Sequence, residues 1–192
     1  YEKIICEYIY IIKNKIYNKT KTLHIINDKF NIPITKVYYN EKKEIELFLK
    51  PILIYNDPFR VKGSVIALSD TFDKNGDPYK DNIRNKLINS LGDPAKINKL
   101  HPVLYLKQDF ELEDIDLKFS KTNYLAEKHY LYCMETNMDI DGYEVKDNKI
   151  SYIIGPNSIT GVCDDIWMSR YILKRIIQNE NLSKNSWFNL GG

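Results

Sequence analysis

The sequence predicts an α+β protein in which strands fill the first half and strands and helices share the second. Short runs rich in β-branched and aromatic residues recur as far as residue 72, which is typical of strands. Two later stretches carry apolar residues at helical spacing. With about 150 residues as a guide to domain size, 192 residues make one domain or two small ones. Gly92–Pro102 has the composition of a linker, so we expect domains at 1–92 and 93–192.

The predicted strands of the first half begin with Lys3–Ile12, whose residues are typical of a buried strand. A basic turn at Lys13–Lys21 is expected to lead into a second strand at Thr20–Leu23. Asp81 is expected to cap a helix that ends near Leu91, before Gly92 and Pro94. The remaining predicted strands are Ile34–Tyr39, Glu44–Leu49 and Ser64–Phe72. Pro51–Tyr55 is expected to continue the extended chain after Glu44–Leu49, and a turn follows at Asp57–Arg60.

The second half is expected to begin with a strand at Val103–Leu112 and a helix at Lys121–Met138. Inward positions of that helix are predicted to include Leu125, Tyr132 and Met134. A hairpin of Tyr143–Lys146 and Ile150–Ile154 follows, around Asp147-Asn148. A last helix is expected to open at Asp164 and Asp165, whose charges would complement the helix dipole. Its predicted apolar face comprises Val162, Ile166, Ser169, Leu173, Ile176 and Ile177.

The composition excludes several classes of protein. Lys, Glu or Asn break the longest apolar stretches, and no run of about 18 apolar residues occurs, so we expect no membrane span. The three scattered cysteines are typical of reduced core residues in a cytoplasmic protein. The net charge of +2 does not indicate a DNA-binding protein. Lysines outnumber arginines 24 to 4, and Ile, Asn and Tyr are abundant, a bias that AT-rich genomes produce, as in many intracellular parasites and large viruses.

A basic segment at the start of the chain is the first candidate contact surface. Its four lysines alternate with other residues around one tyrosine, so the lysines could contact phosphates of RNA while the tyrosine stacks on a base. The alternative is a solvated hairpin without a ligand. The candidate residues are Lys13, Lys15, Tyr17, Lys19 and Lys21.

Short motifs spread along the chain resemble type II, eukaryotic-type glutamine synthetases. Gly155–Ile177 resembles the family's segment GP-x(n)-G-x-x-D-x-[IL]-W-x-[AS]-R-[YF]-I-L-x-R, and Asp57-Pro58-Phe59-Arg60 matches its DPFR. The other matching stretches, in family order, are Glu7–Tyr10 with Lys19–Leu23, Gly76–Asn85, His129–Cys133 and Trp187–Gly192.

The resemblance implies a small N-terminal β-grasp-like domain followed by a truncated catalytic-domain sheet with helices on one face. In that family, ATP and divalent metals join glutamate to ammonia at sites between subunits of a ring. Several carboxylates on adjacent strands hold the metals, which neutralise the transferring phosphoryl group.

The carboxylates that the resemblance places at the metals are only partly present here. The first acid of the family's E-Q-E strand is Lys107, and its second is the shorter Asp109. In the next strand pair Glu144 matches an acid, whereas the following acid is Ser151. A fixed ammonium repels a metal cation. We therefore expect no catalytic residues, no bound metal and no cofactor, with Asp109 and Glu144 as vestiges.

The leading hypothesis is a catalytically inactive protein that binds or regulates a larger assembly in the cytoplasm, with a ribosome-associated, dormancy-type factor as the preferred case. One alternative is an accessory subunit of a glutamine synthetase ring, which would co-purify with a full-length synthetase. Another is a residual enzyme that binds glutamate or nucleotide, which calorimetry with ATP, Mg²⁺ and glutamate would reveal.

Overall fold

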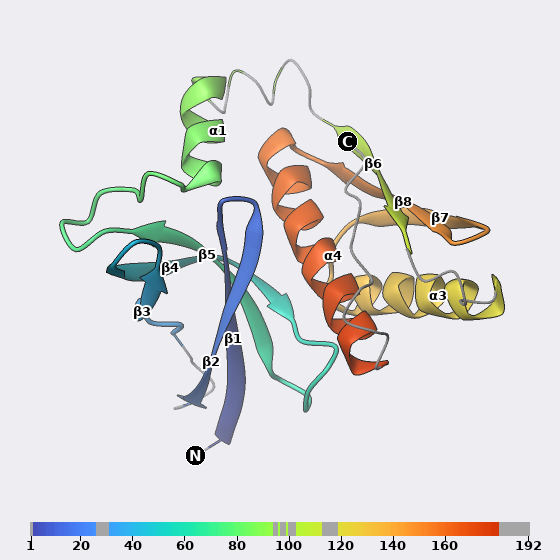
Figure 1. The fold of residues 1–192 in the computed structure, drawn as a ribbon, viewed down its shortest axis with the longest axis horizontal. Coiled ribbons are helices and arrows are strands. Elements are labelled where there is room, and N and C mark those ends of the chain that lie inside the picture. The colour runs from blue at the N-terminus through green and yellow to red at the C-terminus, as the bar shows by residue number, and fades with distance from the viewer. Residues whose placement is uncertain are drawn as a thin grey trace. The chain divides into compact units, whose positions relative to one another are not determined.

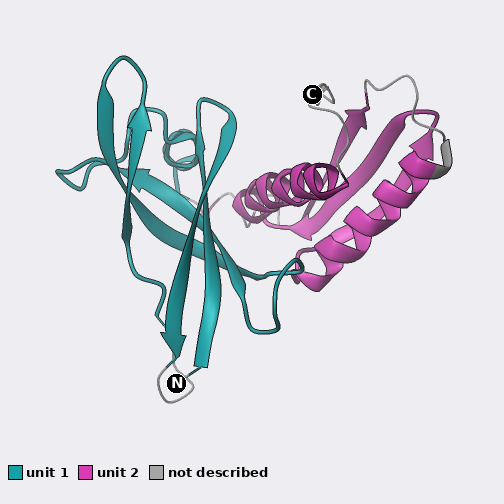
Figure 2. Cartoon of the chain, turned by 60° about the horizontal axis from the view of Figure 1, so that its bottom comes forward, with its two compact units in different colours: residues 1–94 teal, residues 95–192 magenta. Residues whose placement is uncertain are grey.

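The computed structural model describes residues 2–25, 31–93, 103–112 and 119–180, with positions 96 and 99. The chain divides into two compact units, 1–94 and 95–192 (Figure 2). Sheets and helices occur together, so the predicted α+β class is confirmed. The predicted linker is only partly covered, and Trp187–Gly192 lies outside the described residues.

Unit 1 is built on one five-stranded sheet in the order β2-β1-β5-β4-β3 (Figure 1). The central strand β5 runs parallel to its neighbour β1, and the other pairs are antiparallel. The strands are β1 (Glu2–Ile12), β2 (Lys15–Ile25), β3 (Thr35–Asn40), β4 (Glu44–Asn56) and β5 (Val65–Phe72), and the helix α1 (Ile83–Leu91) follows them.

The core of unit 1 lies on one face of this sheet, because alternate side chains of a strand point the same way. β1 contributes every second residue from Ile4 to Ile12, and all five are buried. The outer strands also meet across this core: the Tyr17 ring lies 5.6 Å from that of Tyr10 and 5.7 Å from that of Tyr39. Lys19 Nζ on β2 donates to the Lys36 carbonyl on β3 over 2.5 Å. The sheet therefore curls until its two edge strands approach each other.

Two predictions for unit 1 are wrong in detail. The basic segment is strand rather than turn, because Lys13 and Asn14 alone turn the chain with φ of 49° and 61°. Two left-handed residues suit the twist of a tight hairpin, so pairing resumes at once. The expected continuation of the extended chain through Pro51–Tyr55 is confirmed, because β4 passes through Pro51 with a bulge. Asn82, not Asp81, caps α1, since its side chain accepts from the Asn85 amide over 3.0 Å.

The described part of unit 2 contains an antiparallel three-stranded sheet in the order β6-β8-β7 and the helices α3 and α4. The helices pack on the same face of the sheet, as predicted: Tyr143 and Tyr152 pair in register on adjacent strands, and they contact Tyr130 of α3 and Ser169 of α4 (Figure 2). The elements are β6 (Leu104–Glu111), α3 (Phe119–Glu135), β7 (Ile140–Lys146), β8 (Lys149–Asn157) and α4 (Ile159–Asn179).

The two helices of unit 2 differ from prediction at their ends. α4 begins at Ile159 after the cap Ser158, so Asp164 and Asp165 are buried one turn inside it instead of opening it. Its predicted apolar face is confirmed, since all six residues are buried. In α3, Leu125 is buried as expected, but Met134 is 52% exposed because its neighbour Cys133 takes the inward position. Within the described residues, no helix combines the length and apolarity that crossing a membrane requires.

Candidate functional site on the open face of the second sheet

The positions that the family resemblance assigns to the metals lie together on one face of the β6-β8-β7 sheet. The helices cover the opposite face. Asp109 on β6 pairs with Ser151 on β8, and Ser151 pairs with Glu144 on β7. Residues in one such row share a face, and so do residues two positions along a strand. Lys107 and Lys149 therefore flank the row on the same face. The four positions that the resemblance assigns to the metals, Lys107, Asp109, Glu144 and Ser151, thus lie on one face of the sheet.

The contacts on this open face centre on the Asp109 carboxylate. Ser151 Oγ donates to Asp109 Oδ1 over 2.5 Å. Lys149 Nζ lies 3.4 Å from Oδ2, and Lys107 Nζ lies 3.8 Å from Oδ1. The hydrogen bond from Ser151, followed by the two ammonium charges, lowers the pKa of Asp109. The carboxylate is therefore ionised at neutral pH, with two cations of the chain beside it.

These residues do not fit a divalent metal. Mg²⁺ and Ca²⁺ need several oxygen ligands around one point, most of them charged. Here the ammonium groups of Lys107 and Lys149 lie beside the Asp109 carboxylate. The Ser151 hydroxyl, rather than a carboxylate, lies in the row between Asp109 and Glu144. Among the described residues, no group of three or more His, Cys, Asp or Glu side chains is placed to hold a metal.

The helix-covered face of the same sheet carries a buried polar network that sequence reasoning missed. Ser169 Oγ donates to the Ile166 carbonyl over 2.8 Å, so the Tyr152 hydroxyl donates to Ser169 Oγ over 2.8 Å. His129 Nε2 lies 2.9 Å from the Ser169 carbonyl, which fixes the tautomer that carries its proton on Nε2. Burial lowers the pKa of His129 to about 4.

Cys133 lies next to this network, with its Sγ 3.3 Å from His129 Nε2. A nucleophilic cysteine needs a thiolate and a histidine that can accept its proton. Burial raises the pKa of Cys133 well above its ordinary value, and the His129 nitrogen nearest to it already carries a proton. The pair is therefore structural. The pattern His-x-x-x-Cys was visible in the sequence, but its burial was not.

The predicted basic segment is divided between several roles. Lys13 forms an ion pair with Glu41, and Lys19 donates to the Lys36 carbonyl. The Tyr17 ring packs against the rings of Tyr10 and Tyr39 and is not free to stack on a base. Lys15 is exposed, and Lys21 is half-buried. The five candidates lie on one hairpin, but they do not form one continuous free surface.

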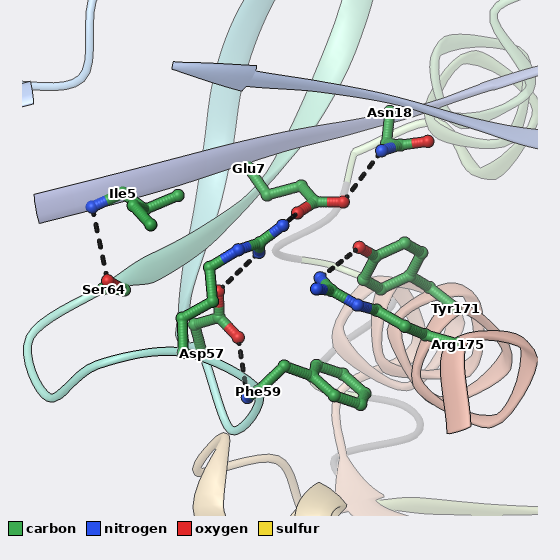
Figure 3. Close-up of polar contacts among 9 residues, drawn as sticks. Ile5, Glu7, Asn18, Asp57, Phe59, Ser64, Tyr171 and Arg175 are labelled. Carbon is green, nitrogen blue, oxygen red and sulfur yellow. Dashed lines mark hydrogen bonds and ion pairs between the residues drawn. The ribbon is translucent and has the colours of Figure 1, made fainter. Parts of the chain in front are cut away.

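The DPFR motif folds into a buried ionic network in unit 1 (Figure 3). Arg60 contacts the Glu7 carboxylate of β1 and reaches Asp57 Oδ2 over 2.7 Å. Asp57 Oδ1 accepts from the Phe59 amide over 2.8 Å, and Asn18 of β2 donates to Glu7 over 2.9 Å. Glu7 and Asp57 are 1% and 8% exposed, so each buried acid has a partner. The motif ties the loop after β4 to the first hairpin.

No model of a protein family matches the chain. It is similar to the chloroplastic glutamine synthetase of Oryza sativa subsp. japonica, with 26% identity over 92% of this chain and 49% of that protein. It is also similar to the glutamine synthetases of Yarrowia lipolytica (26% identity, 91% of this chain) and Panulirus argus (26%, 72%). The chain spans about half the length of the curated relatives it matches. It is a glutamine-synthetase-like protein.

Proposed function

We propose that this protein is a non-catalytic relative of glutamine synthetases that acts as a binding or regulatory factor on a larger assembly. The observation that carries the proposal is the open face of the β6-β8-β7 sheet, where Lys107 and Ser151 stand beside Asp109. We take the ribosome as the assembly and dormancy-type regulation as the role.

The chemistry of phosphoryl transfer supports the loss of activity. Charge that builds up on the transferring group must be neutralised by metal ions or by cations aimed at it. The lysines of the open face are instead directed at Asp109, within 3.8 Å of its oxygens. The polar groups of this face thus neutralise one another.

Retention of the packing contacts supports a role that needs the folded shape. The buried network of Glu7, Arg60 and Asp57 has its partners, and so do Tyr152 and Ser169 under the helices. Such contacts hold a surface in place whether or not a reaction occurs on it. The residues that depart from the family pattern at the metal positions lie on the face that the helices leave open.

The charge distribution supports an RNA-containing partner. Residues 1–94 contain 16 Lys and Arg against 12 Asp and Glu, whereas residues 95–192 contain 12 against 14. A basic unit is attracted to a phosphate-rich surface in a salt-dependent way. An AT-rich intracellular parasite, as the composition suggests, and a cytoplasmic location fit this assignment.

Two measurements test the proposal. On sucrose gradients of cell extract, the native protein should sediment with ribosomal particles, and migration as a free protein would contradict the ribosomal role. In calorimetry with millimolar ATP, Mg²⁺ and glutamate, we expect no binding heat. Heat that depends on all three ligands would favour a residual enzyme and overturn the inactivity.

A second candidate is an accessory subunit of a glutamine synthetase ring. The similarity over 92% of the chain favours it, because relatives of that extent can share subunit contacts. Pull-down from the same extract decides between the two: a full-length synthetase among the captured proteins supports the ring, and ribosomal proteins without a synthetase exclude it.

A further inference from the structure

We infer that the hairpin ends of unit 1 form a surface that binds the phosphate backbone of RNA. This hairpin-tip surface comprises Lys13, Lys15, Lys42, Lys43 and Lys80. The inference rests on the proposed function for the identity of the RNA as ribosomal, and it differs from the basic segment of β2 because it joins three separate parts of the chain.

Glu41 brings these three parts together. Its carboxylate forms an ion pair with Lys13, in the turn between β1 and β2, and lies 3.3 Å from Lys80 Nζ, in the connection after β5. Glu41 itself begins the turn between β3 and β4, which continues with Lys42 and Lys43. Two hairpin turns and one connecting segment therefore meet at the same end of the sheet.

The β1–β2 turn places a lysine where turn chemistry favours another residue. Lys13 and Asn14 both have positive φ, a conformation in which Asn and Gly are common and lysine is not. The turn thus accepts a strained residue that presents an ammonium group at the tip. Asn14 beside it follows the ordinary preference, so the exception is confined to the charged position.

The charges at this end leave an excess of cations. Five lysines are accompanied by Glu41, Glu44 and Asp81. Both ion pairs of Glu41 are with lysines of the set, whereas Lys15, Lys42 and Lys43 are exposed and form no ion pair within the described part of the chain. Three free ammonium groups remain for a partner, one at the start of β2 and two on the turn between β3 and β4.

The arrangement fits a phosphate backbone better than a small anion. A small anion is held by donors that converge on one point, often with bidentate arginines. Here the donors are lysines on separate turns, which are mobile point charges suited to a row of phosphates. Because such contacts read no base, we expect binding without strong sequence preference.

The test compares two double variants of the whole chain that carry the same change of charge. K42E/K43E reverses two free lysines of the hairpin-tip surface. K3E/K62E reverses two exposed lysines at the other end of the sheet, since Lys3 lies at the start of β1 and Lys62 follows β4. Lys3 and Ile12 lie nine positions apart on β1, a span of about 30 Å. Circular dichroism verifies that both variants fold.

Fluorescence anisotropy with a labelled RNA hairpin, over a salt series, gives the affinities. We expect K42E/K43E to weaken binding at least about tenfold and to lower the salt slope by about 1.5, and K3E/K62E to stay near wild type. An equal loss of RNA affinity in both variants would contradict the assignment of the hairpin-tip surface. If polyglutamate competes with the RNA hairpin, and RNase does not change what the protein captures from cell extract, the partner is an acidic protein. That result would also contradict the inference.

Gradient sedimentation of the same variants separates this inference from the proposed function. If the wild type and K42E/K43E both sediment with ribosomes, the inferred RNA-binding role of the hairpin-tip surface is wrong and the ribosomal role stands. If the wild type stays free in extract but binds the RNA hairpin through Lys42 and Lys43, the ribosomal role is wrong and the surface stands.

Discussion

The two faces of the β6-β8-β7 sheet follow different rules although they share the same backbone. The covered face carries Ile150 and Tyr152, both buried, with Tyr152 bonded to Ser169 of α4. The open face carries Ser151 and Lys149, which alternate with them along β8 and contact Asp109. Packing against helices limits which residues the first face can hold, whereas no helix of the described chain sets such a limit on the second face.

Adjacent residues of β8 give the largest expected contrast. Ile150→Ala should lower the free energy of unfolding by about 2–5 kcal/mol, because it leaves a cavity under the helices. Lys149→Ala should change it by about 0–1 kcal/mol, because its ion pair is exposed. Urea unfolding measures both. Similar values for the two variants would contradict the division between the faces.

The pH dependence of stability should reveal His129. Its folded pKa of about 4 lies below the ordinary 6.5, so the unfolded chain takes up a proton first as the pH falls. The contribution is complete above pH 6.5 and is lost between 6.5 and 4, by up to about 3 kcal/mol. Cys133 and Tyr152 stay neutral there, because burial raises both pKa values.

Urea unfolding of wild type and His129→Gln between pH 7 and 4 isolates this contribution. The stability of the wild type should fall more steeply than that of the variant, since the carboxylates titrate in both proteins. Parallel curves would show that the ring is not held neutral by its surroundings.

A smaller loss is expected from Ser169→Ala, which leaves the buried Tyr152 hydroxyl without its acceptor. The free energy of unfolding should fall by about 1–3 kcal/mol. The double variant Ser169→Ala/Tyr152→Phe removes both partners and should recover part of the loss. If the double variant is less stable than the single one, the hydrogen bond is not what the hydroxyl contributes.

Restoring acids to the open face should create an affinity for metal. K107E/S151E places two carboxylates beside Asp109 and Glu144, and we expect Mn²⁺ to bind at least about tenfold more tightly, or about 1.4 kcal/mol. Calorimetry with MnCl₂ measures it. K62E/S90E, with the same charge change in unit 1, should leave Mn²⁺ affinity near wild type. If K107E/S151E binds Mn²⁺ no more tightly than the wild type, residues other than these two also prevent metal binding on this face.

Sequence patterns predicted the elements of this fold where burial decides them. The six residues that the apolar period assigned to the inner face of α4 are among its eleven buried residues, and the runs of β-branched and aromatic residues placed β1, β3 and β5. The patterns failed where a single side chain decides. The cap Ser158 places the start of α4 at Ile159 rather than at Asp164. A two-residue turn at Lys13 lets β2 begin within a stretch whose lysines resemble a loop.

The sequence was enough to predict which residues make up the candidate site, but not which contacts they form. Motif spacing placed Lys107, Asp109, Glu144 and Ser151, and strand register then joined them. Lys149 was not predicted as a partner of Asp109, because its role depends on hairpin register rather than on any motif. Likewise, neither Glu41 nor Lys80 stands out in the sequence, since their ion pair joins residues 39 positions apart.

The curl of the first sheet has a consequence for behaviour at high concentration. Exposed edge strands invite pairing with other chains and are common starting points for aggregation. In unit 1 the edges β2 and β3 are bridged by the Tyr17 and Tyr39 rings and by the bond from Lys19 to the Lys36 carbonyl. The lysine that occupies an edge carbonyl from within thus also guards that edge against another chain, which helps a Lys-rich protein stay dispersed in a crowded cell.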